Sequence, residues 1–206
     1  MGKIISNNLF FKEIPIIDIS PLLDPFDNPK TVQTTAKQIR NACKNVGFFY
    51  VKKHQIPQNH LDDVVLVMQE FFNLTEKEKL KIHISKSDAF RGYTPLGKEL
   101  TNAKYDWHEC VDFGLDIESS QDEVIAGNQL MGPNQWPENQ TNFRKVLERH
   151  WNLMIVLGRR ITEGLAISLG LDKKFFAPFM DKSHSFMRIS NYPPYGKNQE
   201  ENVGDG

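Results

Sequence analysis

The segment at residues 185–194 constrains the fold of this chain more than any other part of the sequence. It reads Ser-Phe-Met-Arg-Ile-Ser-Asn-Tyr-Pro-Pro, and side chains alternate between the two faces of a strand. One face would then carry mostly polar groups, from Phe186, Arg188, Ser190 and Tyr192. Residues 195–206 are polar and contain three glycines, which predicts a loop. We therefore expect a strand with a polar face, in a chain that is the front part of a longer fold.

Composition indicates an ordinary soluble globular protein. Of the 206 residues, 39% are hydrophobic and 25% are charged, which is typical of such proteins. The 25 basic and 26 acidic residues leave a net charge of -1, so neither nucleic acid nor an anionic membrane surface is favoured as a partner. No apolar run approaches the roughly 20 residues that span a bilayer, and a signal peptide is not recognisable. We expect a cytoplasmic protein with no membrane partner.

Periodicity predicts a mixture of helices and strands. Apolar residues recur at three- and four-residue spacing, which predicts helices, in the segments 30–45, 61–72 and 143–165. Runs of β-branched or aromatic residues predict strands at 14–19, 48–51, around 93 and 107–113. We expect the strand at 48–51 to be buried. Thr75 and Glu78 have the spacing of a capping box, which predicts a short helix.

Histidines and their neighbours are the candidate metal ligands. His60 follows a proline-containing turn and is expected at the surface, whereas His150 lies on an apolar helical stripe and is expected in the core. On a strand, His108, Cys110 and Asp112 share one face and could hold a metal ion. Three neighbouring side chains on one strand splay too regularly to surround an ion by themselves. We favour a strand whose polar face lines a cavity, and we assign no metal ligand.

Seven short motifs extend across nearly the whole chain. They are Ile-Pro-Ile-Ile-Asp-Ile-Ser, Val-Gly-Phe-Phe-Tyr-Val with a later His and Ile-Pro, Phe-Phe before Thr-Glu-Lys-Glu-Lys, Arg-Gly-Tyr, Asp-Trp through Asp-Phe-Gly, Asn-Gln-Trp-Pro, and Met-Arg through Tyr-Pro-Pro. They lie at 14–20, 46–57, 71–79, 91–93, 106–114, 134–137 and 187–194. In order and spacing they resemble the isopenicillin N synthase-like family of Fe(II)- and 2-oxoglutarate-dependent oxygenases.

The resemblance implies an α+β, mainly β, fold. Its centre is a double-stranded β-helix, or jelly roll, preceded by a helical N-terminal region. Residues 1–115 would form that N-terminal region, and residues 116–206 would form a long bracing helix and the start of the jelly roll, whose C-terminal half would be missing. Such enzymes hold Fe(II) with a His-x-Asp pair and a distal His. Those ligands normally follow the Tyr-Pro-Pro strand, so we assign none of them here.

The resemblance also implies a set of pocket residues. Tyr192 matches the family tyrosine whose hydroxyl reaches a carboxylate of co-substrate or substrate, and Arg188 and Ser190 share its inward face as cofactor-binding residues. Arg91 and Tyr93 match the segment near the cavity mouth and are the substrate-binding candidates, because Arg can hold a carboxylate. Two plainer interpretations stay open, which are a core tyrosine for Tyr192 and a surface residue for Arg91.

The implied activity is that of an Fe(II)/2-oxoglutarate-dependent dioxygenase acting on a small organic substrate. We expect the 206-residue chain to be inactive alone and to bind neither Fe(II) nor 2-oxoglutarate tightly, because no residue of this sequence can be assigned as an iron ligand. One alternative is an iron oxidase that needs no 2-oxoglutarate. Another is a non-catalytic protein completed by a partner polypeptide. A third is a truncated product that does not fold alone, because its sheet edges stay open.

Overall fold

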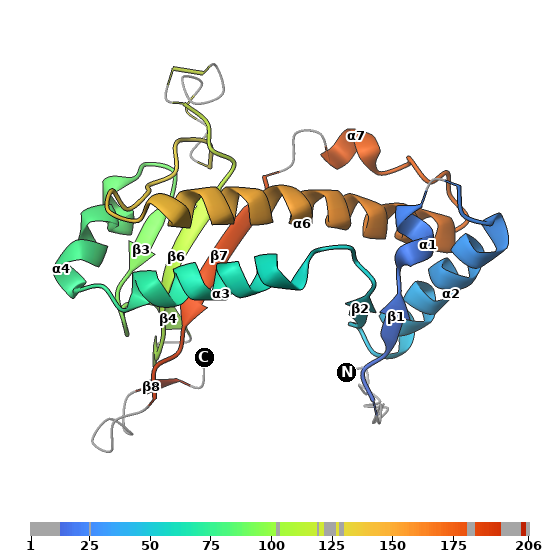
Figure 1. Ribbon diagram of the computed structural model, residues 1–206, viewed down its shortest axis with the longest axis horizontal. Coiled ribbons are helices and arrows are strands. Elements are labelled where there is room, and N and C mark those ends of the chain that lie inside the picture. Colours follow the sequence, from blue (N-terminus) through green and yellow to red (C-terminus); the bar gives the residue numbers. More distant parts are fainter. Residues whose placement is uncertain are drawn as a thin grey trace, which may run out of the picture. The chain divides into compact units, whose positions relative to one another are not determined.

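The computed structural model describes residues 13–24, 26–101, 104–118, 120–121, 127, 130–180, 184–194 and 203–204. The chain forms two compact units, each built from two separate segments (Figure 1). Unit 1 consists of Met1–Gln58 and Asn152–Ser183, and unit 2 of Asn59–Trp151 and His184–Gly206. The predicted family division at residue 115 stays a prediction. Among the described residues, no helix has the length and apolar character that crossing a membrane requires.

Unit 1 packs helices against a two-stranded parallel sheet. Strand β1 (Ile16–Asp18) pairs with β2 (Tyr50–Lys52). The helices are α1 (Ser20–Leu23), α2 (Pro29–Asn45), α7 (Ala177–Met180) and the part of α6 (Thr141–Ser168) from residue 152 onward. The core of unit 1 comes from β1, α1, α2 and α6 and the residue that follows β1, and it contains Ile17, Ile19, Leu22, Ile39, Ala42 and Leu157. The predicted helix at 30–45 is therefore confirmed, and its apolar stripe faces this core.

The strand predicted at 48–51 differs from the observed one. It spans residues 50–52, and the prediction that it is buried is wrong for half of its side chains. Phe49 and Val51 pack against the core of unit 1, whereas Phe48 and Tyr50 are 51% and 61% exposed. The physical reason is alternation: only one face of the β1–β2 pair is covered by that core.

Unit 2 is built around a three-stranded antiparallel sheet. Its central strand β6 (Glu109–Gly114) lies between β3 (Gly92–Thr94) and β7 (Phe186–Asn191), as Figure 1 shows. A second sheet joins β4 (Leu100–Thr101), β5 (Lys104–Asp106) and β8 (Val203–Gly204). Most of the predicted loop at 195–206 lies outside the described residues, and within it β8 is a strand. The helical elements are α3 (Gln58–Phe72), α4 (Glu76–Lys79), η1 (Leu80–Ile82), η2 (Ile84–Lys86) and the first part of α6.

One face of the β3–β6–β7 sheet forms the core of unit 2. Its core residues come from the sheet, from α3, from η1 and from α6, and they are Val64, Val67, Phe71, Ile82, Tyr93, Val111, Phe113, Phe143, Leu147 and Ile189. The register pairs Asp112 with Arg188 and Cys110 with Ser190 on the opposite side. We call this opposite side, with the side chains of His108, Cys110, Asp112, Arg188 and Ser190, the polar face. The predicted alternation along β7 and the α+β class are confirmed.

Two local predictions in unit 2 have different outcomes. The capping box of α4 is confirmed, because Thr75 Oγ1 accepts a hydrogen bond from the Glu78 amide while Glu78 Oε2 accepts one from the Thr75 amide. The surface position predicted for His60 is wrong, since its side chain is only 1% exposed. Position 60 lies on the same stripe of α3 as Val64, Val67 and Phe71, so the helix carries it inward. Its ring faces that of His150, with centroids 5.6 Å apart.

Candidate functional site

Arg188 occupies the middle of the polar face and is held by two carboxylates. Its Nε and Nη2 donate to the two oxygens of Asp112 at 2.7 and 2.8 Å. Its Nη1 donates to Glu99 Oε1 at 2.8 Å and to Oε2 at 2.9 Å. The hydrogen bonds to Asp112, with a smaller contribution from Glu99, raise the pKa of Arg188. Asp112 and Glu99 therefore compete with any ligand carboxylate for this guanidinium.

Glu99 precedes β4 in the chain and joins the face from outside the sheet. Its Oε2 lies 2.8 Å from His108 Nε2 and 3.9 Å from Cys110 Sγ. Partial burial acts to raise the pKa of Glu99, but hydrogen bonds from Arg188 and His108 outweigh it and lower the pKa. Burial, together with the negative charge of Asp112, raises the pKa of Cys110 to about 11. Sequence reasoning missed Glu99, because no spacing pattern links it to β6.

Tyr192 lies just after β7, at the His108 end of the polar face. Its ring packs against the ring of His108 with centroids 5.1 Å apart. Trp107 Nε1 donates to the carbonyl oxygen of Pro193 at 3.0 Å and so fixes the backbone beside it. The Tyr192 side chain is nevertheless 61% exposed. The structure thus brings Arg188, Ser190 and Tyr192 to one face, as the sequence predicts, and leaves the tyrosine accessible.

Tyr93 lies on the opposite face, inside the core of unit 2. Its hydroxyl donates to Glu109 Oε2 at 2.5 Å, and that oxygen also accepts from Lys79 Nζ at 2.6 Å. Asn191 Nδ2 donates to the other oxygen at 2.9 Å. Burial is the largest single influence on Glu109 and raises its pKa, but the three donors together lower it. Burial and the bond to Glu109 raise the pKa of Tyr93. This buried network fixes the side chain of Asn191, which lies between Ser190 and Tyr192 in the sequence.

Arg91 lies at the Phe186 end of the sheet. It is buried, and its Nη1 and Nη2 donate to the carbonyl oxygens of Ala89 and Leu130, each at 2.8 Å. Its guanidinium carbon lies 5.7 Å from the centroid of the Phe186 ring. The Arg91 guanidinium packs closely against Gly114. A Cβ at position 114 would overlap Arg91 Nη2, so this close packing requires glycine there. Burial lowers the pKa of Arg91. The structure therefore does not bring the guanidinium of Arg91 together with the hydroxyl of Tyr93.

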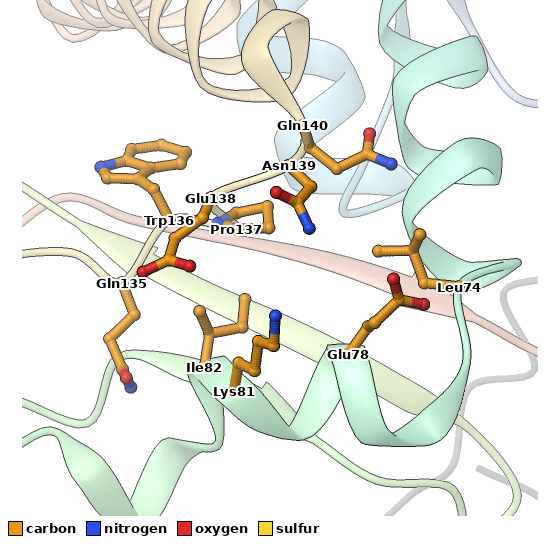
Figure 2. Close-up of a pocket in the computed structure, with 10 residues that line it drawn as sticks. All are labelled: Leu74, Glu78, Lys81, Ile82, Gln135, Trp136, Pro137, Glu138, Asn139 and Gln140. Carbon is orange, nitrogen blue, oxygen red and sulfur yellow. The ribbon is translucent and has the colours of Figure 1, made fainter.

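A surface cleft in unit 2 adjoins Arg91 through Gln135, whose Nε2 donates to the carbonyl oxygen of Arg91 at 2.7 Å. Figure 2 shows its lining, which comes from the α4–η1 region and from the segment that leads into α6. Its volume is about 240 Å³, and the residues around it are Leu74, Glu78, Lys81, Ile82, Gln135, Trp136, Pro137, Glu138, Asn139 and Gln140. None of the predicted site residues lines it. Glu78, one of its charged residues, is engaged in the capping box of α4. The candidate site is therefore the polar face, because that face carries Arg188, Ser190 and Tyr192.

The described residues do not contain the iron centre typical of the resembled family. Their cluster of three potential metal ligands consists of Glu99, His108 and Cys110. A triad of two histidines and one carboxylate is not found in that part of the chain. The polar face can therefore supply the wall of a pocket but, within the described residues, not the iron ligands.

The sequence matches a known protein family. A family profile described as "non-haem dioxygenase in morphine synthesis N-terminal" matches residues 14–139. That span is more than half of the chain and contains β1 to β6, including Glu99, His108, Cys110 and Asp112. The chain belongs to the 2-oxoglutarate- and Fe(II)-dependent oxygenase family.

Individual relatives are similar over about half of their own length. A homoarginine-6-hydroxylase from Glycine max is 36% identical over 189 residues, which cover 89% of this chain and 57% of that protein. One from Oryza sativa subsp. japonica is 38% identical over 165 residues, covering 78% of this chain and 50% of that protein. The crystal structure of a full-length Neurospora crassa protein in complex with alpha-KG matches with a TM-score of 0.73 and 25% identity, covering 87% of this chain and 54% of that one. The chain thus spans about half the length of these proteins.

Proposed function

We propose that the protein functions as an Fe(II)/2-oxoglutarate-dependent dioxygenase acting on a small organic substrate, and that this chain supplies one wall of its jelly-roll pocket. The observation that carries the proposal is the separation of the two sheet faces. Ser190 and Tyr192 lie with Arg188 on the polar face, whereas Tyr93, Val111 and other alternate residues are buried in the core. A homoarginine-6-hydroxylase name among the relatives favours an amino-acid-like substrate. The division at residue 115 and a cytoplasmic location belong to the same proposal.

Tyr192 and Ser190 are the proposed contacts to 2-oxoglutarate. Both carry hydroxyl groups that can donate to a carboxylate, and Tyr192 is accessible. Arg188 adds positive charge to the wall, but Asp112 and Glu99 hold its guanidinium, so its proposed role is to position Glu99 and the strand. When bound with iron, 2-oxoglutarate supplies electrons for oxygen activation by its decarboxylation to succinate.

Arg91 is the proposed contact to a substrate carboxylate. Its Nε is buried and has no hydrogen-bond partner among the described residues, so a substrate carboxylate that reached it would supply the partner it lacks. Tyr93 contributes indirectly, because its hydroxyl helps to fix Glu109 and through it Asn191. We therefore assign Tyr93 a positioning role in the proposed site.

A partner polypeptide that completes the fold is a second proposal. It rests on the position of β7, which is an outer strand of the described β3–β6–β7 sheet. An outer strand presents backbone groups that can pair with another strand. A discrete complex in size-exclusion chromatography would support this proposal, and a strictly monomeric chain in the presence of cell extract would count against it.

Succinate formation tests the proposed function. With Fe(II) and 2-oxoglutarate, we expect the 206-residue chain alone to form no succinate above the metal-only background. A fusion of residues 1–194 to the C-terminal half of the Glycine max relative should form succinate. In that fusion Tyr192→Phe should lower kcat/KM for 2-oxoglutarate roughly 10- to 100-fold, the loss of one hydrogen bond to a charged group.

Tyr50→Phe is the matched control for that substitution. Tyr50 is also 61% exposed but lies on β2 in unit 1, so its replacement should leave turnover unchanged. Circular dichroism would establish that each fusion is folded. Equal activity of the Tyr192→Phe and Tyr50→Phe fusions would remove Tyr192 from the site, and a folded fusion without succinate formation would overturn the proposed function.

A further inference from the structure

Three different metal-ligand atoms converge on the polar face without belonging to the family's iron triad. They are Glu99 Oε2, His108 Nε2 and Cys110 Sγ, which all lie within 4.8 Å of one another. His108 and Cys110 are buried, and the Glu99 side chain is 31% exposed. His108 and Cys110 lie two positions apart and share a face, and Glu99 reaches them from outside the sheet. Because Glu99 approaches from a different direction, the three ligand atoms can surround an ion, which His108 and Cys110 on one face could not do by themselves.

The distances suit a tetrahedral ion. With bonds of about 2.3 Å to sulfur and 2.0–2.2 Å to nitrogen or oxygen, tetrahedral zinc separates its ligand atoms by about 3.3–3.6 Å. The observed separations of Glu99 Oε2 are 2.8 Å from His108 Nε2 and 3.9 Å from Cys110 Sγ, on either side of that range. The third separation, between the ligand atoms of His108 and Cys110, is within 4.8 Å, so side-chain rotations would bring the three atoms to tetrahedral distances. Because Glu99 is partly exposed, water can supply the fourth ligand.

Arg188 and Asp112 orient the Glu99 carboxylate, as residues that hydrogen-bond to metal ligands do in metal sites. Arg188 Nη1 lies 2.8 Å from Glu99 Oε1, so this bond persists when Oε2 turns to an ion. Asp112 in turn holds Arg188 through two hydrogen bonds. With Cys110 as a thiolate, the charges of Glu99, Asp112, Cys110 and Arg188 sum to about -2. A divalent cation neutralises the cluster.

The second ring nitrogen of His108 leaves the imidazole free to present Nε2 to a metal. Nδ1 is buried and has no hydrogen-bond partner among the described residues. In the metal-free chain the Glu99 carboxylate accepts a hydrogen bond from Nε2. Because Nδ1 has no described partner, it can take that proton when Nε2 binds an ion.

We propose that Glu99, His108 and Cys110 form a binding site for a zinc-class divalent transition metal, with water as the fourth ligand. A thiolate in the ligand set favours such ions over Mg²⁺ or Ca²⁺. Binding releases the Cys110 thiol proton to solvent and joins the segment before β4 to strand β6. The site is independent of the proposed dioxygenase function, because metal binding by the 206-residue chain is measured without Fe(II), 2-oxoglutarate or turnover.

Cobalt(II) is the probe, because a cobalt–thiolate bond produces a near-ultraviolet charge-transfer band. Titration of the metal-free 206-residue chain should give this band with one equivalent of Co²⁺, and Zn²⁺ should remove it by displacement. Cys110→Ser should abolish the band. Cys43→Ser is the matched control and should leave it unchanged, because Cys43 is exposed on α2 in unit 1.

Glu99→Gln tests the carboxylate at a partly exposed position, where the fold should tolerate it. We expect it to weaken Co²⁺ binding roughly 10- to 100-fold, a loss typical of perturbed metal sites. Affinity should also fall about tenfold for each unit of decreasing pH, as expected when one proton is released. A folded wild-type chain without the band would overturn the proposal. So would a band that survives Cys110→Ser, or Co²⁺ affinity unchanged by Glu99→Gln.

Discussion

Replacement of Glu109 by Gln tests whether the buried network behind the polar face stabilises unit 2. The carboxylate accepts hydrogen bonds from Lys79, Tyr93 and Asn191. Lys79 Nζ also donates to the carbonyl oxygen of Phe72 at 3.1 Å. Glu109→Gln preserves the shape of the side chain but removes the charge, so Lys79 is left as a buried cation without its counter-ion.

The expected loss follows from the burial of both partners. The Lys79 and Glu109 side chains are only 10% and 7% exposed, and removing one member of a buried ion pair costs about 3–5 kcal/mol. The amide oxygen that the substitution introduces can still accept from Tyr93 or Asn191, which places the expectation near the lower end of that range. We therefore expect the free energy of unfolding to fall by about 3 kcal/mol at neutral pH.

Urea unfolding followed by tryptophan fluorescence measures this loss. The pKa of Glu109 is lower in the folded protein than its ordinary value of 4.5, so its charge stabilises the fold above that pH and this contribution disappears as the pH falls toward the folded pKa. The difference between wild type and Glu109→Gln should therefore narrow below about pH 4.5.

Glu118→Gln is the control, because Glu118 is exposed and follows the same strand. Its unfolding free energy should stay within about 0.5 kcal/mol of wild type. A Glu109→Gln loss below about 1 kcal/mol, or a loss independent of pH, would refute the reasoning that the buried charge pair stabilises unit 2.

Substitutions at four further positions probe other parts of the two units. Gly92→Ala should destabilise unit 2 by at least about 2 kcal/mol in urea unfolding, because residue 92 has φ +117° and an added Cβ would overlap a carbonyl oxygen of η1. Gly158→Ala is the contrasting substitution. An added Cβ there meets open space on α6, so it should stabilise the protein by about 0.5–1 kcal/mol. Burial lowers the pKa values of His60 and His150 below 6.5, so the stability of the fold should decrease as the pH drops below that value. Thermal melts at several pH values measure this dependence, and His150→Leu should reduce it. Thr75→Ala should cost about 1 kcal/mol by loss of the cap, whereas Thr75→Ser should cost little.

Local patterns predicted most of the secondary structure. The three- and four-residue spacing of apolar side chains located α2, α3 and α6, because a helix repeats every 3.6 residues. The Thr75–Glu78 spacing located the cap of α4. Alternation along 186–192 grouped Arg188, Ser190 and Tyr192 before any partner strand was known. Each of these features depends on contacts between near neighbours in the sequence.

The exposure of the same elements was harder to predict. Periodicity states which side chains share a face, but not which face meets the core. His60 lies after a turn and still belongs to the buried stripe of α3. Tyr50 is exposed because only the other face of the β1–β2 pair is covered by the core of unit 1. Burial is a property of the assembled layers, so the sequence around one residue does not determine it.

The sequence by itself determined the family, the order of helices and strands, and the grouping of polar side chains on one strand face. Only the tertiary structure decided their partners. It placed Glu99 against His108, Cys110 and Arg188, and it turned the hydroxyl of Tyr93 toward Glu109 in the core. Local periodicity arises from the geometry of one element, whereas these contacts join segments whose separation in the chain carries no repeating signal.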